Sequence, residues 1–199
     1  MSSALRAALL VIAVGSLCFG GPIATFTSGD YATHGHDQTV GWAFTVNSAI
    51  TVDYLYWYDP QQALNRDIQV GMWDLAQVVM IPSTGVGPDS GTWANGYWGV
   101  AITPVTLLAS DEFVIGGQIA PGDLILDHIL GLSTPPEIAY VEARASWSGT
   151  LTFPGGGQGL GAGYIGPNFG IESGVPEPGT WIFLATGLLA FGVSRRRSA

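Results

Sequence analysis

VGWAFTVNSAITVDYLYWY, residues 40–58, is the stretch that decides the fold class. Two runs within it place an apolar residue at every second position: Val40, Trp42, Phe44 and Val46 in the first, and Ile50, Val52, Tyr54 and Tyr56 in the second. A period of two is that of a β-strand with one buried face, and Asn47-Ser48 predicts a turn between the strands. On this alternation Trp57 lies on the face opposite Tyr54 and Tyr56.

Short apolar runs continue outward from this pair toward the C-terminus. The further strands that they predict are Ile68–Trp73, Gln77–Ile81, Tyr97–Ile102, Phe113–Ile119, Leu124–Leu130, Ile138–Ala145 and Tyr164–Ile171. Segments rich in Gly or Pro, such as 82–91 and 120–123, separate them. The pattern predicts an all-β fold: a single antiparallel, jelly-roll-like β-sandwich over residues 25–174, flanked by an N-terminal signal helix and a C-terminal transmembrane helix.

Tryptophan is plentiful in this predicted body. The alternation places Trp42 and Trp73 with core-facing neighbours. Trp57 falls on the other face, while Trp93 and Trp98 flank a predicted turn at Asn95-Gly96. Because an indole face stacks on sugar rings, Trp57, Trp93 and Trp98 are the expected glycan-stacking residues. Packing in the core or at a strand edge is the alternative for each of them.

The charge of the chain excludes one class of function. It carries 15 Asp and Glu against 6 Lys and Arg, a formal net charge of -9, and the only positive residues outside its two ends are Arg66 and Arg144. Binding to a phosphate backbone needs clustered Lys or Arg. We therefore expect no nucleic-acid partner.

Two groups of residues have the donor types that metal ions prefer. Asp53, Asp59, Asp67 and Asp74 border predicted strands and a loop, and carboxylates in irregular loops suit a structural calcium ion. The alternative is that they form turns and keep the surface soluble. His34, His36 and Asp37 could in principle bind zinc or copper, although solvated polar residues are the simpler interpretation. No cofactor is expected.

The sequence lacks the motifs of common catalytic sites. It has no Gly-x-Ser-x-Gly, His-Glu-x-x-His or cysteine cluster, and the glycine-rich segment 154–163 lacks the residues of a phosphate-binding loop, so it predicts a surface loop. We therefore expect a protein that is not an enzyme. A secreted hydrolase stays open as an alternative, because adjacent carboxylates such as Asp111 and Glu112 are compatible with an acid–base pair.

The N-terminal residues 1–24 have the pattern of a secretory signal peptide. Arg6 precedes the apolar run 7–19, and the small residues Gly20 and Gly21 follow it. A first transmembrane helix is the alternative, but the run is shorter than the roughly 20 residues that span a bilayer. Cys18, the single cysteine, lies within this segment, so removal of the signal peptide would leave a mature chain without disulfides.

The C-terminal residues 175–199 combine three elements in order. Pro176-Glu177-Pro178 is followed by the apolar run 180–193 and then by Arg195, Arg196 and Arg197, which predict a stop-transfer cluster on the cytoplasmic side. This arrangement resembles the PEP-CTERM sorting signal. The resemblance implies export through the secretion machinery, an inner-membrane-anchored precursor, recognition of the tripeptide by an exosortase, and release or attachment at the surface of a Gram-negative bacterium that makes exopolysaccharide. A membrane anchor that is never cut is the alternative.

The body has a second resemblance, carried by several short motifs. They are Gly41–Val46, Val52–Leu55, Val70–Asp74, Pro104–Leu107, Phe113–Gly117 and Gly166–Phe169. In this order they resemble an uncharacterised β-sandwich domain of unknown function found in secreted bacterial proteins with this sorting tail, with Phe113 where that family usually has Tyr. The resemblance implies a sandwich fold and lends no catalytic residue.

The function that these patterns predict is that of an exported cell-surface or extracellular-matrix protein. We expect it to be noncatalytic and to associate with extracellular polysaccharide, because the tail gives its destination and the body lacks a recognisable nucleophile. A purely structural surface spacer and a secreted glycan-active hydrolase are the alternatives.

Overall fold

The computed structural model describes residues 20–159 and 163–171, which belong to one compact unit, Gly20–Val175. These residues form strands and no helix, so the predicted all-β class is confirmed. The strands are β1 (Ser28–Thr33), β2 (Gln38–Val46), β3 (Ile50–Tyr58), β4 (Ile68–Asp74), β5 (Val79–Val86), β6 (Thr92–Ala94), β7 (Tyr97–Leu107), β8 (Glu112–Ile119), β9 (Leu124–Leu130), β10 (Ile138–Trp147), β11 (Gly156–Gly159) and β12 (Pro167–Ile171).

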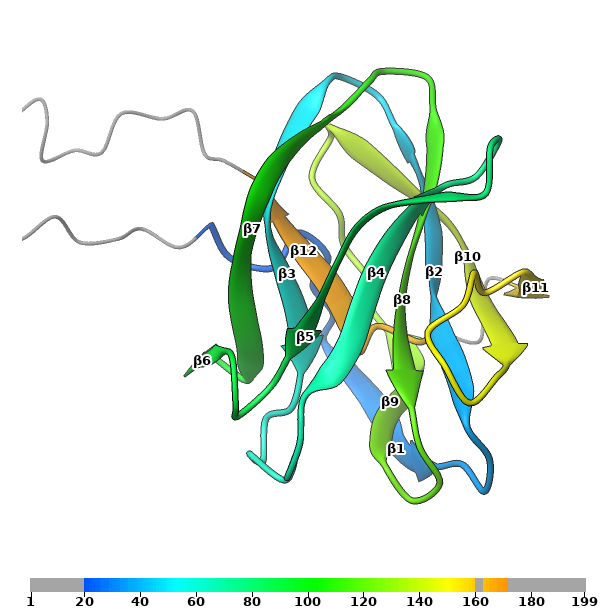
Figure 1. Ribbon diagram of the computed structural model, residues 1–199. Helices are drawn as coiled ribbons and strands as arrows, with labels where there is room; N and C mark the ends of the chain where they lie inside the picture. The colour runs from blue at the N-terminus through cyan, green and yellow to red at the C-terminus, as the bar shows by residue number, and fades with distance from the viewer. Residues whose placement is uncertain (1–19, 160–162, 172–199) are drawn as a thin grey trace, which may run out of the picture. The chain divides into compact units, whose positions relative to one another are not determined.

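Three antiparallel sheets contain these strands (Figure 1). The largest has six strands in the order β11-β10-β2-β8-β4-β5, the second has four in the order β12-β3-β7-β6, and β1 pairs with β9 in the third. In the two larger sheets, β4-β5, β6-β7 and β10-β11 are neighbours in both sheet and sequence, whereas β2 and β3 lie in different sheets. The residues 40–58 that predicted a strand pair therefore cross from one layer to the other.

The two larger sheets pack face to face around an aromatic centre. Trp42 on β2 donates its indole N–H to the main-chain oxygen of Pro167 at 2.8 Å, and its ring stacks on Phe169 of β12 with centroids 5.8 Å apart. Phe44 also contacts Phe169, at 4.9 Å. Because β2 and β12 belong to different sheets, these contacts join the layers, and the predicted core position of Trp42 is confirmed.

A β-bulge in β3 reverses the side on which its residues lie. Against β12, Gly170 pairs with Tyr54 and Ile171 pairs with Val52, so β3 has one extra residue at this point. Ile50 and Val52 face the core before it, and Leu55 and Trp57 face the core after it. An extra residue in one strand changes the phase of the alternation. Trp57 does lie on the face opposite Tyr56, but that face is the core, so the alternative of core packing holds for it.

Two glycines make room for the Trp57 ring. A Cβ on Gly117 of β8 would lie 2.3 Å from Trp57 Cζ3, and a Cβ on Gly166 would lie 2.9 Å from Cη2. The indole thus fills the space that side chains on the facing β8 and on the segment before β12 would otherwise occupy. Trp57 consequently exposes 0% of its surface.

A second set of glycines shapes the outer face of the six-stranded sheet. Gly41, Gly116 and Gly71 are direct neighbours across β2, β8 and β4. Residues 148–155 cross this row, and Leu151 and Pro154 lie 3.0 and 3.2 Å from where Cβ atoms on Gly71 and Gly116 would be. The small residues therefore provide the groove in which this segment packs.

Several predicted boundaries differ from the structure. β5 continues through Pro82, where a turn was expected, because a register shift between Gly71 and Trp73 of β4 accommodates the proline in an edge strand. Part of the glycine-rich segment forms β11, since Gly156 approaches the main chain of Ala145 closely. Residues 23–24, expected before the body, are buried in its core. The predicted signal helix, transmembrane helix, Pro176-Glu177-Pro178 and Arg195–Arg197 lie outside the described residues.

Candidate functional site

Asp59 organises the loop that follows β3. Its carboxylate accepts hydrogen bonds from the main-chain N–H groups of Ala63 and Leu64, at 3.0 and 3.1 Å, and from the indole N–H of Trp98 at 3.0 Å. Its main-chain oxygen accepts the indole N–H of Trp93 at 2.9 Å. A buried carboxylate needs such donors to offset its lost hydration. Asp59 therefore fixes both the loop and the two tryptophans.

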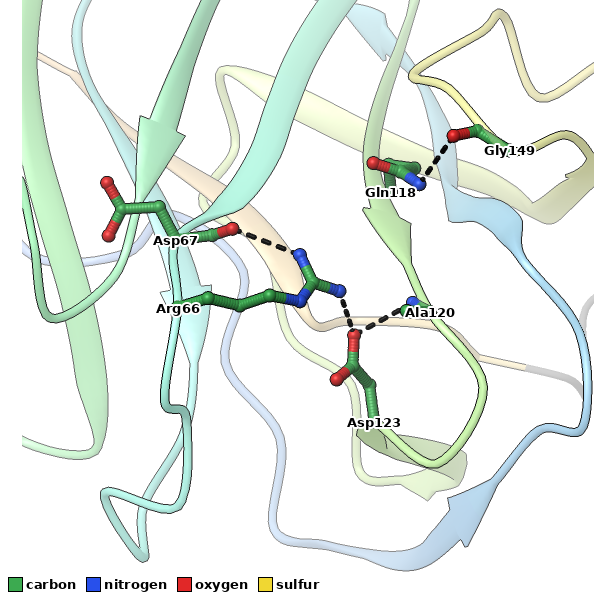
Figure 2. Close-up of polar contacts among 6 residues, drawn as sticks. All are labelled: Arg66, Asp67, Gln118, Ala120, Asp123 and Gly149. Carbon is green, nitrogen blue, oxygen red and sulfur yellow. Dashed lines mark hydrogen bonds and ion pairs between the residues drawn. The ribbon is translucent and has the colours of Figure 1, made fainter.

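A cavity of about 170 Å³ opens beside this loop. Trp57 and Asp59 line it from one side, and Asp123 lines it from the turn between β8 and β9. Figure 2 shows how that turn is held: the Arg66 guanidinium contacts the Asp123 carboxylate and the main-chain oxygen of Asp67, and Asp123 also accepts the Ala120 N–H at 2.8 Å. The ion pair connects the two segments that border the cavity.

Main-chain hydrogen bonds extend this region across the end of the body. The Gly122 N–H donates to the main-chain oxygen of His34 at 3.0 Å, which joins the β8–β9 turn to the segment before β2. The Ser148 N–H donates to the main-chain oxygen of Asp37 at 3.3 Å, which joins the segment before β2 to the segment after β10. We call this connected surface the loop end, consisting of residues 59–67, 120–123, 34–37 and 147–150. It brings together segments far apart in sequence.

Trp147 is the exposed aromatic residue of the loop end. It is the last residue of β10 and exposes 72% of its surface. The His36 ring packs against the indole with centroids 4.9 Å apart at 58°. The Ser148 hydroxyl accepts the Thr150 N–H at 3.2 Å, so the turn beside the indole also presents hydroxyl groups. An oriented aromatic face next to hydroxyls is suited to binding the apolar face of a sugar ring.

The three tryptophans predicted to stack on glycans form one row across β3, β7 and β6. Trp57 pairs with Trp98, and Trp98 pairs with Trp93. Trp57 exposes 0% of its surface, and Trp93 and Trp98 are half-buried with their N–H groups bound to Asp59. Sequence reasoning did not single out Trp147, although its place just before Ser148-Gly149 was a signal of a strand end.

The structure does not gather the four candidate calcium ligands. Within residues 20–159 and 163–171, no three His, Cys, Asp or Glu side chains form a group that could hold a metal ion. Asp67 accepts the Asp89 N–H, and Asp74 accepts the Gln77 N–H at 2.9 Å in the turn after β4. Asp53 lies in β3 itself. The four aspartates therefore lie in different strands, loops and turns and do not form one site.

The two candidate histidine ligands contact different aromatic residues. His34 meets Tyr164 edge to face at 6.2 Å, whereas His36 meets Trp147. The predicted acid–base pair, Asp111 and Glu112, is exposed at the start of β8 and does not line the cavity. The cavity instead pairs Asp59 with Asp123, whose oxygens accept the hydrogen bonds described above.

Burial affects the tyrosines of the four-stranded sheet. Tyr56 and Tyr97 are nearly buried, and loss of hydration raises the pKa of each phenol well above its usual value. In the six-stranded sheet, burial likewise raises the pKa of Tyr140 on β10 to about 12. The shifts keep these phenols neutral at alkaline pH values at which an exposed tyrosine ionises.

The geometry defines an all-β protein with antiparallel sheets and a polar loop end. Residues 174–197 match the family model of the PEP-CTERM protein-sorting motif. No curated protein matches the chain. The chain therefore carries this sorting motif, as its terminal residues predicted, while its body has no family assignment. The motif implies an exported, cell-surface-associated protein that an exosortase processes. In the described part of the chain, no helix has the length and apolarity to cross a membrane.

Proposed function

We propose that this protein is a noncatalytic surface or matrix protein that associates with extracellular polysaccharide through its loop end. The body would be a jelly-roll-like β-sandwich, and the precursor would stay anchored in the inner membrane until exosortase cleaves it. The main support for the proposal is the exposure of Trp147. Its indole is at the end of β10, exposes 72% of its surface and packs against His36. The sorting motif supports the location at which a polysaccharide would be met.

The carboxylates of the cavity support a noncatalytic role. Asp59 accepts hydrogen bonds on both oxygens, and Asp123 is engaged by Arg66 and by a main-chain N–H. A glycoside hydrolase needs one carboxyl group that donates a proton and a second that attacks or activates water. Carboxylates committed to loop structure are poorly placed for either step.

The experiment uses the exported protein as its host releases it. Exopolysaccharide purified from the producing strain is immobilised, and retention of the protein is measured over a concentration series, together with release of reducing ends. Saturable retention without new reducing ends is the expected result. Absence of retention would favour a structural spacer, and release of reducing ends would favour a hydrolase, so either result overturns the proposal.

A further inference from the structure

Four consecutive apolar residues, one in the turn before β5 and three at the start of β5, are exposed to solvent. Val78, Val79, Met80 and Ile81 expose 52%, 54%, 45% and 38% of their surfaces. Single exposed apolar residues are ordinary on protein surfaces, whereas a consecutive run on both faces of a strand needs a reason. This run, residues 78–81, is called the apolar edge below.

The apolar edge lies on a strand that can accept another one. β5 ends the six-stranded sheet, with β4 as its neighbour on the inner side. The outer side of such a strand is a template for main-chain pairing with another chain. Beside it, a groove of about 480 Å³ separates β5 from β7 and is lined by Ile81, Thr84, Ile102 and Val105 among others. In Figure 1 the two strands lie next to each other on one flank of the body.

Val78 adds an independent observation. Its φ of 54° places a β-branched residue in the left-handed region, where Gly or Asn is far more favourable. Its N–H donates a hydrogen bond to the main-chain oxygen of Asp74 at 2.9 Å, which closes the turn. Its side chain lies outside the core and is half exposed. Packing inside the body therefore does not compensate for the strain of this valine.

Charge indicates what covers the apolar edge. Residues 78–86 and 97–108 contain no charged side chain, although the chain carries a net charge of -9. The two arginines of the described residues, Arg66 and Arg144, are each paired with a carboxylate of the same chain. A basic partner would favour the acidic surface elsewhere. Two copies of this chain, which repel each other through their carboxylates, can meet at this uncharged flank.

We propose that the apolar edge pairs antiparallel with the apolar edge of a second copy. An antiparallel pair of identical strands is compatible with a two-fold axis, so the same patch serves both copies and the contact closes as a dimer. The pairing joins two six-stranded sheets into one, covers Val78 to Ile81 on both copies, and places apolar residues opposite apolar residues with no like charges facing.

The test measures the molar mass of the exported, tail-processed protein by light scattering over a concentration series. The wild-type protein should have the mass of a dimer and dissociate on dilution. Val79→Lys with Ile81→Lys should shift the midpoint of dissociation to at least about tenfold higher concentration, because like charges then face each other. Leu130→Lys is the matched control: Leu130 is 65% exposed but lies on β9, so dimerisation should be unchanged.

A second variant separates pairing from general loss of structure. Val78→Asn relieves the left-handed strain, so at concentrations where the protein is monomeric its melting temperature should rise while dimerisation weakens. A wild-type protein that is monomeric throughout, or a dimer that the double lysine variant leaves intact, would overturn the proposal.

Discussion

Trp57 and Trp147 have side chains on interior faces of their sheets, yet one is fully buried and the other exposes 72% of its surface. Trp57 faces Gly117 across the gap between the sheets, where the glycine leaves room for the indole. Trp147 follows Ala143 and Ala145 on the core-facing side of β10 but is the last residue of that strand. At the strand end, the loop segment 34–37 contacts the indole through His36.

The side of the sheet on which a strand residue lies and the depth at which it is buried are separate properties. Alternation determines the side, whereas depth depends on what the other sheet places opposite. A tryptophan opposite a glycine becomes part of the core, and a tryptophan beyond the edge of the facing sheet becomes surface. Stability should therefore depend strongly on Trp57 and weakly on Trp147, with the reverse order for ligand binding.

Removal of the buried indole should destabilise the protein more than any other change considered below. Trp57→Ala should lower the free energy of unfolding by about 3–5 kcal/mol, because it leaves a cavity between Gly117 and Gly166 that the two sheets cannot close. Urea unfolding followed by far-ultraviolet circular dichroism measures this change. A loss below about 1 kcal/mol would mean that the indole is not a core residue.

Filling the space opposite Trp57 should be the next most damaging change. Gly117→Val places a branched side chain where even a Cβ would lie 2.3 Å from the indole, so we expect a loss of about 1–3 kcal/mol. Gly149→Val is the matched control, since a Cβ at this exposed position meets nothing within 4 Å. Thermal unfolding of the two variants side by side should show a large shift for the first alone; equal shifts would contradict the proposed packing.

Alkaline pH should destabilise the body through its buried tyrosines. Burial raises the folded-state pKa of Tyr56 and Tyr97 above that of an exposed phenol, so above about pH 10 the unfolded chain loses protons that the folded chain keeps. This stabilising contribution is complete below pH 10 and falls by up to about 1.4 kcal/mol per pH unit for each tyrosine as the pH rises further.

Unfolding in urea at a series of pH values between 9 and 12 measures this fall. Tyr97→Phe removes one of the two phenols and should make the decline with pH shallower. A pH dependence that is the same in the variant and in the wild-type protein would show that Tyr97 does not ionise preferentially in the unfolded state.

Sequence patterns located most strands but not the residues that matter at the loop end. Alternation placed Trp42 correctly because β2 pairs with β8 without a shift. It did not reveal that the face of Trp57 is the core one, because the extra residue between Val52 and Tyr54 depends on pairing with β12. The link between Arg66 and Asp123 joins residues 57 positions apart, so no local pattern could reveal it. The sorting tail was identified because its three elements are contiguous in the sequence.

Trp147 gives the smallest expected effect on stability and the most direct test of the proposed function. Trp147→Ala and Leu130→Ala both shorten exposed side chains, so each should change the free energy of unfolding by less than about 0.5 kcal/mol. The decisive measurement is the affinity of these two variants and the wild-type protein for immobilised exopolysaccharide from the producing strain. We predict that Trp147→Ala binds at least about tenfold more weakly while Leu130→Ala binds as the wild-type protein does. Equal binding by all three proteins would contradict the assignment of Trp147 as the glycan-stacking residue.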